Sequence, residues 1–285
     1  MPEIAACAFS VAPERARDLQ KLRESYGIKL EAVDEPRFGI RVDPLTGTVK
    51  LPVAALEYLW ACAHLFVVVY QENVKAQASS RSQLQFHTNP NLQRAEALFG
   101  WAKRNLNGDG KAMWPSGLPT PEQRLQNADL EFITHLFLIA LAWIIHHEVA
   151  HVTQRHTPGI TSRSLTEENG ADRVATDWIL GDRDPNAQDT LKRGLGIATA
   201  ILTLQSLEIR QSTMHGPETH APAQERLHRC LGGYQIGSEQ GIEAYTVSTL
   251  QVLYDELGIR ADINGNSFQD IQAGLLVEKS RLDRQ

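Results

Sequence analysis

The sequence has few cysteines and no excess of positive charge, and each shortage excludes a class of protein. Three cysteines among 285 residues, Cys7, Cys62 and Cys230, are odd in number and widely spaced. They argue against a disulfide framework and indicate reduced core residues of a cytoplasmic protein. With 28 basic and 34 acidic residues, the formal net charge is -6. We therefore expect no nucleic-acid partner, because nucleic-acid binding needs a basic surface.

The sequence also lacks an apolar run that is long enough to cross a membrane, since a spanning helix needs about 20 apolar residues. The run from Trp60 to Tyr70 contains His64, and the run from Leu136 to Ile145 ends at a histidine pair. The N-terminus has no positively charged segment before its apolar residues, so we expect no signal peptide. Both runs predict buried core helices, and His64 is expected to be a core residue.

The second apolar run leads into His147-Glu148-Val149-Ala150-His151, an HExxH pattern. Residues four apart lie on one face of a helix, so both imidazoles can reach one cation, for which Zn²⁺ is the natural candidate. Glu148 can reach a water on the metal, which is the position of a hydrolytic general base. His156 is a further candidate ligand. However, the metzincin pattern requires glycine and histidine where the chain has Gln154 and Thr157.

A second helix is predicted from Ser164, where Ser164 and Glu167 form a capping box. Glu168 and Asp172 share one face of it. Catalytic zinc takes three protein ligands and leaves one position open, so Glu168 can complete the set with His147 and His151. Asp172, one turn further, is expected to accept the free N–H of a ligand histidine.

A third motif contains His220, Pro222 and Arg226. Proline suits the first position of a helix, which leaves His220 at the positive N-terminal end. His220 and Arg226 are therefore candidate catalytic residues that stabilise an oxyanion beside the metal. Alternatively, Arg226 pairs with Asp172 and holds two motifs together, or both residues lie on a solvated face.

These three motifs resemble those of the gluzincin metallopeptidases. The HtpX and CAAX-prenyl endopeptidase group carries a similar HExxH, ExEAD and HPP...R series, but those are multispanning membrane enzymes. This chain also differs from them at Asn169-Gly170 and at Ala221. Its length and its alanine-aspartate helix soon after HExxH are closer to the phage-exclusion Lit-type peptidases. That resemblance implies a protein substrate inside the bacterial cell and a role in phage exclusion.

The predicted fold is α+β and mostly α-helical: a single zincin-like domain over 1–285, with an N-terminal α/β portion (1–51) and a helical catalytic portion (52–285). A hairpin is expected over 38–51 around Asp43-Pro44-x-x-Gly47, and its edge could bind an extended substrate. The active helix begins at Thr120 or after a turn near Asp129, and 77–119 could form a lid. The other expected elements are a strand near 4–9 and helices over 13–26, 52–76, 92–105, 184–211, 242–257 and 268–282.

The chemistry favours a zinc-dependent peptidase that acts on a protein or peptide substrate. The opposing hypothesis is a non-catalytic scaffold or regulatory protein in which zinc only links helices. Structural zinc usually fills all four positions, often with cysteines, and no cysteine lies near the HExxH motif in the sequence. We therefore expect catalysis.

Overall fold

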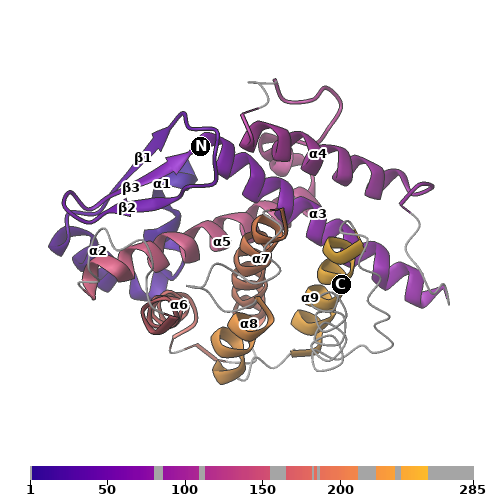
Figure 1. The fold of residues 1–285 in the computed structure, drawn as a ribbon. Coiled ribbons are helices and arrows are strands. Elements are labelled where there is room, and N and C mark those ends of the chain that lie inside the picture. Colours follow the sequence, from indigo (N-terminus) through magenta and orange to yellow (C-terminus); the bar gives the residue numbers. More distant parts are fainter. Residues whose placement is uncertain are drawn as a thin grey trace, which may run out of the picture.

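The computed structural model describes residues 2–79, 86–108, 113–154, 165–181, 183–184, 187–210, 223–234 and 239–255, most of them in helices (Figure 1). The α-helices are α1 Pro2–Ser10, α2 Ala16–Ser25, α3 Val53–Ala78, α4 Pro90–Leu106, α5 Ala128–Thr153, α6 Leu165–Leu180, α7 Gln188–Arg210, α8 Ala223–Leu231 and α9 Glu239–Asp255. Short 3₁₀ helices are η1 Pro13–Arg15, η2 Pro121–Gln126 and η3 Gly232–Tyr234, and the strands are β1 Lys29–Val33, β2 Arg41–Asp43 and β3 Thr48–Pro52. The expected fold class, mostly helical with a small N-terminal sheet, is confirmed.

The sheet has the strand order β1-β3-β2, so β2 and β1 form its edges. β2 and β3 are antiparallel, with Val42 opposite Val49, which confirms the predicted hairpin. In the turn of this hairpin, the Asp43 carboxylate accepts a hydrogen bond from the backbone N–H of Leu45 at 2.9 Å. Gly47 has φ +67, and a Cβ there would lie 2.5 Å from the carbonyl oxygen of Tyr26. Only glycine fits this position.

The expected strand near residues 4–9 is wrong, because this segment forms α1. The segment PEIAACAFS is rich in alanine, which has the highest helix propensity. Its packing against α5 supports the helix, since the Ala8 carbonyl accepts a hydrogen bond from His146 Nε2 at 2.6 Å. The packing against α5 therefore determines the secondary structure of this segment, and the short alternation of apolar residues does not.

α5 is the helix around which the others are arranged (Figure 1). It follows η2, where Thr120 and Gln123 form a capping box, and Asn127 caps α5 itself. This confirms the second of the two expected starts. Buried residues occur on all sides of α5, which packs against α1, α3, α6 and α7. At the α7 contact, a Cβ on Gly196 would lie 2.4 Å from Cγ2 of Ile139, so no larger residue fits at position 196 while isoleucine occupies position 139.

Two helices, Val53–Ala76 and Ala128–Thr153, are long and apolar enough to cross a membrane by length and composition. In both, however, 67% of the most apolar window is buried inside the protein. Burial at this level is typical of core helices, as the sequence predicted. The three cysteines are also buried and free, as expected.

Several predictions fall on positions outside the described residues. These are the Ser164 cap, the candidate ligand His156, the helix over 268–282 and His220. The described residues of the 77–119 segment, by contrast, form α4 and part of the wall of a cavity near the start of α5.

Candidate metal centre

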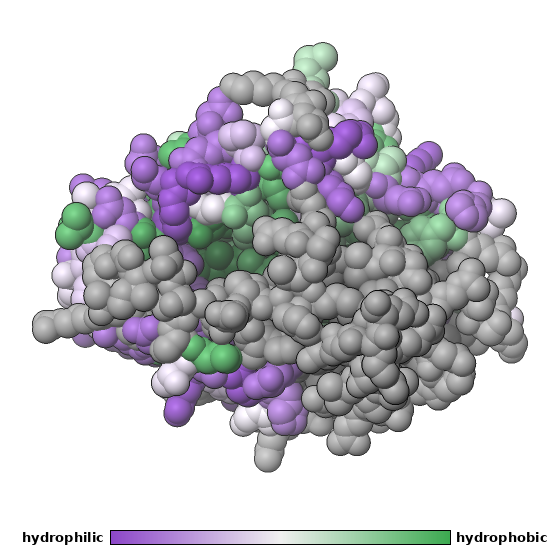
Figure 2. All heavy atoms as spheres, in the orientation of Figure 1, coloured by the Kyte–Doolittle hydropathy of each residue, from purple (hydrophilic) through white to green (hydrophobic). Residues whose placement is uncertain are grey.

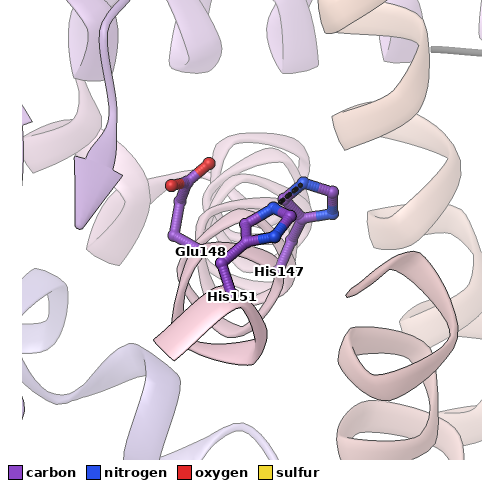
Figure 3. A group of neighbouring side chains, drawn as sticks. All are labelled: His147, Glu148 and His151. Carbon is purple, nitrogen blue, oxygen red and sulfur yellow. Dashed lines mark hydrogen bonds between the residues drawn. The ribbon is translucent and has the colours of Figure 1, made fainter. Parts of the chain in front are cut away.

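His147 and His151 lie one turn apart near the C-terminal end of α5, and their rings face one another (Figure 3). Their Nε2 atoms are 3.2 Å apart, and the ring planes cross at 82°. Together with Glu148 they offer ligand atoms that all lie within 4.8 Å of one another. Both histidines are buried. The cluster could therefore hold a metal ion at the place where the HExxH pattern predicted one.

Glu168 reaches the same point from α6. Its Oε2 lies 3.1 Å from Nε2 of His147 and 3.7 Å from Nε2 of His151. Two ligands of a tetrahedral zinc, each about 2.0–2.2 Å from the metal, are roughly 3.3–3.6 Å apart. The separations between the three atoms of His147, His151 and Glu168, 3.1, 3.2 and 3.7 Å, are close to this range on either side, so small shifts of the side chains would suit one shared zinc ion.

Asp172, one turn after Glu168 on α6, lies behind His147. Its Oδ1 is 2.9 Å from Nδ1 of His147. Because an ionised carboxylate can only accept a hydrogen bond, Nδ1 must carry the proton, and Nε2 of neutral His147 then directs its lone pair toward Glu168 and His151. Burial alone would lower the pKa of His147, but the hydrogen bonds with Asp172 and Glu168 raise it to about 9. The carboxylates around the His147 ring thus favour a positive charge at this position.

Arg226, on α8, binds the other side of Asp172. Its Nε donates to Oδ2 at 2.9 Å and its NH2 group donates to Oδ1 at 2.7 Å. Both side chains are almost fully buried, with 4% and 6% of their surface exposed. Burial by itself would raise the pKa of Asp172, but the charge of Arg226 and the bonds from His147 and Arg226 hold that pKa well below its usual range. Arg226 thus pairs with Asp172 and links the third motif to the second, which is one of the two alternatives given for it above.

Trp143 and Thr176 complete this arrangement, and neither was predicted from the sequence. Trp143 packs its ring against His147 and lies under the guanidinium of Arg226, with a carbon-to-centroid distance of 5.5 Å. Its indole N–H donates to Thr176 at 3.0 Å, and Thr176 donates to the backbone carbonyl of Asp172. The signal in the sequence was the spacing, because Trp143 precedes His147 by one helical turn and Thr176 follows Asp172 by one turn.

Cys230 is far from the HExxH motif in the sequence, but the fold brings it close to Asp172. It follows Arg226 by one turn on α8, and its thiol is within hydrogen-bonding reach of Thr176. Burial raises the pKa of this thiol to about 12, so it stays protonated. A zinc ligand must be a thiolate. Cys230 therefore acts as a packing residue behind Asp172.

Glu148 is only partly buried, and its carboxylate points away from the His147 ring toward a strand (Figure 3). The backbone N–H of Val42 in β2 donates to Oε2 of Glu148 at 3.3 Å. The hairpin was predicted from the sequence, but this contact was not. It places an edge strand of the sheet beside the residue expected to be the general base. On the face shown in Figure 2, hydrophobic residues lie in a recess below a mostly hydrophilic upper rim, over the part where Figure 1 shows α5.

His146 does not belong to the metal cluster. Its ring stacks on Trp178, with centroids 5.8 Å apart, and its Nε2–H is donated to Ala8. Burial lowers the pKa of His146 to about 4, which keeps the ring neutral. His146 is therefore a structural residue of the contact between α1 and α5.

A helical fold with an HExxH helix, a carboxylate from the next helix and an adjoining edge strand defines the class of the zincin-like peptidases. Comparison with known proteins is more specific. The Peptidase U49 family matches residues 49–246, and the chain belongs to this family. It is 38% identical over 279 residues to the "Cell death peptidase" of Escherichia coli (strain K12), covering 96% of this chain and 94% of that protein. No solved structure matches. The expected Lit-type gluzincin relationship and peptidase activity are confirmed.

Proposed function

We propose that this peptidase is zinc-dependent and that His147, His151 and Glu168 hold the metal. The observation that carries the proposal is the convergence of the three ligand atoms at 3.1–3.7 Å from one another. The donor set of two imidazoles and one carboxylate is the one used by catalytic zinc sites, which leave a fourth position for water. Zinc bound there supplies Lewis acidity, which activates the water and polarises the scissile carbonyl.

The chain's own residues divide the remaining work. Glu148 takes the proton from the attacking water and then delivers it to the leaving amine. Asp172 fixes the tautomer of His147, and Arg226 fixes Asp172 in turn, so Arg226 acts as a positioning residue. His220 is proposed to donate a hydrogen bond to the oxyanion that develops on the scissile carbonyl, as the N-terminal position before α8 suggests.

The edge strand β2 is the proposed substrate platform. Backbone groups of successive residues in a strand point alternately to its two sides. Since the Val42 N–H points to Glu148, the Val42 carbonyl lies on the same edge, which is the one not used by β3. A substrate in extended conformation can add to this edge, where main-chain hydrogen bonds hold it beside Glu148.

We further propose that the substrate is a protein in the cytoplasm and that cleavage serves phage exclusion. The support is the similarity to a peptidase whose name associates it with cell death and the resemblance to Lit-type peptidases. The scaffold alternative is less favoured, because a set of three protein ligands would leave a fourth position for water, and Glu148 is next to one of these ligands on the same helix.

The test compares wild type, Glu148→Gln, His151→Ala and the control Glu131→Gln, which changes an exposed glutamate on the same helix. Wild type, Glu148→Gln and the control should each carry about one zinc per chain, whereas His151→Ala should lose it. Only Glu148→Gln should combine full zinc with a loss of cleavage of at least a hundredfold, measured as new protein N-termini in expressing cells. Full zinc in His151→Ala would refute the ligand assignment. Unchanged cleavage by Glu148→Gln would refute the role of Glu148.

A further inference from the structure

The outer face of the N-terminal sheet carries a row of charged side chains that ends at the β2 edge. In this sheet β1, β3 and β2 lie side by side (Figure 1). Lys50 of β3 is paired with Arg41 of β2 on one side and with Glu31 of β1 on the other. The flanking residues Val49 and Leu51 are buried, so the side chains of the charged row point away from the core. Arg41 is the member of this row that lies at the β2 edge.

The guanidinium of Arg41 is held in one orientation by the segment that precedes β2. Its Nη1 donates to the carbonyl of Gly39 at 2.9 Å, and its Nη1 and Nη2 donate to the two carboxylate oxygens of Glu35 at 3.1 and 3.0 Å. Arg37 binds the same carboxylate, with its Nε and Nη2 at 2.8 and 2.7 Å from Oε2. Because Arg41 is already oriented, a further contact costs little conformational entropy.

The cluster of Arg37, Arg41 and Glu35 has a surplus of positive charge and of hydrogen-bond donors. The bonds from Arg41 and Arg37 hold the pKa of Glu35 at about 2, so two cations surround one anion at neutral pH. Both oxygens of Glu35 are occupied, whereas Nε of Arg41 and Nη1 of Arg37 donate to no residue in the part of the chain that the structure describes. The side chains of Arg37 and Arg41 are 62% and 38% exposed. The cluster can therefore bind another carboxylate.

Asp43, the other outward residue of β2, does not cancel this charge at the same position. Its carboxylate is turned into the hairpin turn, where it accepts the hydrogen bond from Leu45. It lies two residues, or about 6.8 Å, further along the strand than Arg41. Lys50 lies directly opposite Arg41 and adds positive charge, whereas Glu31 is one strand further away. The positive charge is therefore concentrated around Arg41.

A peptide bound to the β2 edge would become the fourth strand of this sheet. Residues directly opposite one another on neighbouring strands have Cβ atoms about 4.5–5.5 Å apart and project to the same face. The peptide residue opposite Arg41 would therefore project beside its guanidinium, and the residue opposite Val42 would project to the other face. Val42 donates to Glu148, and Arg41 precedes Val42 by one residue, or about 3.4 Å along the strand. The charged position thus lies close to the residue proposed as the general base.

We propose that Arg41, supported by Arg37, is a specificity-determining residue that selects substrates with an aspartate or glutamate opposite it. The inference rests on the proposed function in one respect, namely that β2 is the substrate-binding edge of this peptidase. Opposite charges that face one another on neighbouring strands stabilise the pairing of those strands. Because the cleaved bond must lie at the metal centre, the acidic residue should stand at one fixed position relative to that bond.

The test is cleavage of a proteome-derived peptide library by the purified full chain, with the cut sites identified by mass spectrometry. Sites that are cut by wild type and not by Glu148→Gln should have aspartate or glutamate enriched at one position. One such sequence is then synthesised with glutamate, glutamine or lysine at that position. Wild type should cleave the glutamate peptide with a kcat/KM about fivefold higher than the glutamine peptide, the upper end for one cross-strand ion pair. It should cleave the lysine peptide more slowly than both.

Variants that change the charge of the cluster give the decisive comparison. Arg37→Gln/Arg41→Gln leaves Glu35 as its one charged residue, so the lysine peptide should become the better substrate. Glu35→Gln should strengthen the preference for glutamate, an effect that the loss of a merely structural ion pair would not produce. The matched control Arg17→Gln changes an exposed arginine on α2 and should behave like wild type. All variants should keep the zinc content of wild type.

Two negative results can be told apart. Cleavage without an acidic preference, or the same preference in wild type and in Arg37→Gln/Arg41→Gln, would overturn the inference and leave the proposed peptidase function intact. The absence of any site that is cut by wild type and not by Glu148→Gln would refute the proposed function, and this inference with it.

Discussion

Replacement of Arg226 by methionine tests the link between α8 and the metal centre. The change leaves the Asp172 carboxylate buried, with two of its hydrogen bonds, at 2.7 and 2.9 Å, removed. Breaking a buried ion pair by removing one partner typically costs about 3–5 kcal/mol. Both side chains are at most 6% exposed, so water cannot replace the guanidinium. We therefore expect Arg226→Met to lower the free energy of unfolding by an amount within that range.

The assay is urea unfolding of the metal-free protein, followed by chelator competition for zinc affinity. Arg226→Met/Asp172→Asn should be more stable than Arg226→Met alone, because the double variant no longer buries an uncompensated charge. Zinc affinity of Arg226→Met should fall by about 10–100-fold, since Asp172 no longer orients His147 firmly. A loss of less than about 1 kcal/mol in Arg226→Met, with unchanged zinc affinity, would refute the reasoning.

Three further predictions concern other parts of the molecule. His220→Ala should lower kcat by about a hundredfold or more with little change in KM or zinc content, as steady-state kinetics would show; a change confined to KM would exclude an oxyanion role. Val42→Pro removes the edge-strand N–H that donates to Glu148, so kcat/KM should fall about tenfold while zinc content, measured by metal analysis, stays the same. An unchanged kcat/KM would argue against β2 as the substrate-binding edge. Burial lowers the pKa of His64 to about 4 from 6.5, so the unfolded chain takes up a proton first as pH falls. This histidine should therefore cost about 3 kcal/mol of unfolding free energy between pH 6.5 and 4, and urea unfolding of His64→Phe should show a correspondingly weaker pH dependence.

The sequence predicted the parts of the centre that depend on helical spacing. His147 and His151, and likewise Glu168 and Asp172, are four residues apart, and this spacing fixes their common face before any tertiary contact is known. The hairpin was predictable for the same reason, because an Asp-Pro-x-x-Gly turn is determined by adjacent residues.

Features that depend on distant contacts were not predictable. β1 carries the charged residues Lys29 and Glu31 and is a strand because it pairs in parallel with β3, about twenty residues later. α1 is a helix because it packs on α5. The contact between Val42 and Glu148 joins residues more than a hundred positions apart, and no local pattern encodes such a distance.

The close approach of α7 to α5 restricts how this family can vary. Gly196 has no room for a methyl group, because Ile139 fills the space that its Cβ would need. Ile139 lies on the helix that also carries His147, so a displacement of α7 would be transmitted to the helix bearing the metal centre. A relative that has alanine at position 196 should therefore have a smaller residue at position 139. Position 196 can therefore gain a side chain only together with a change at position 139.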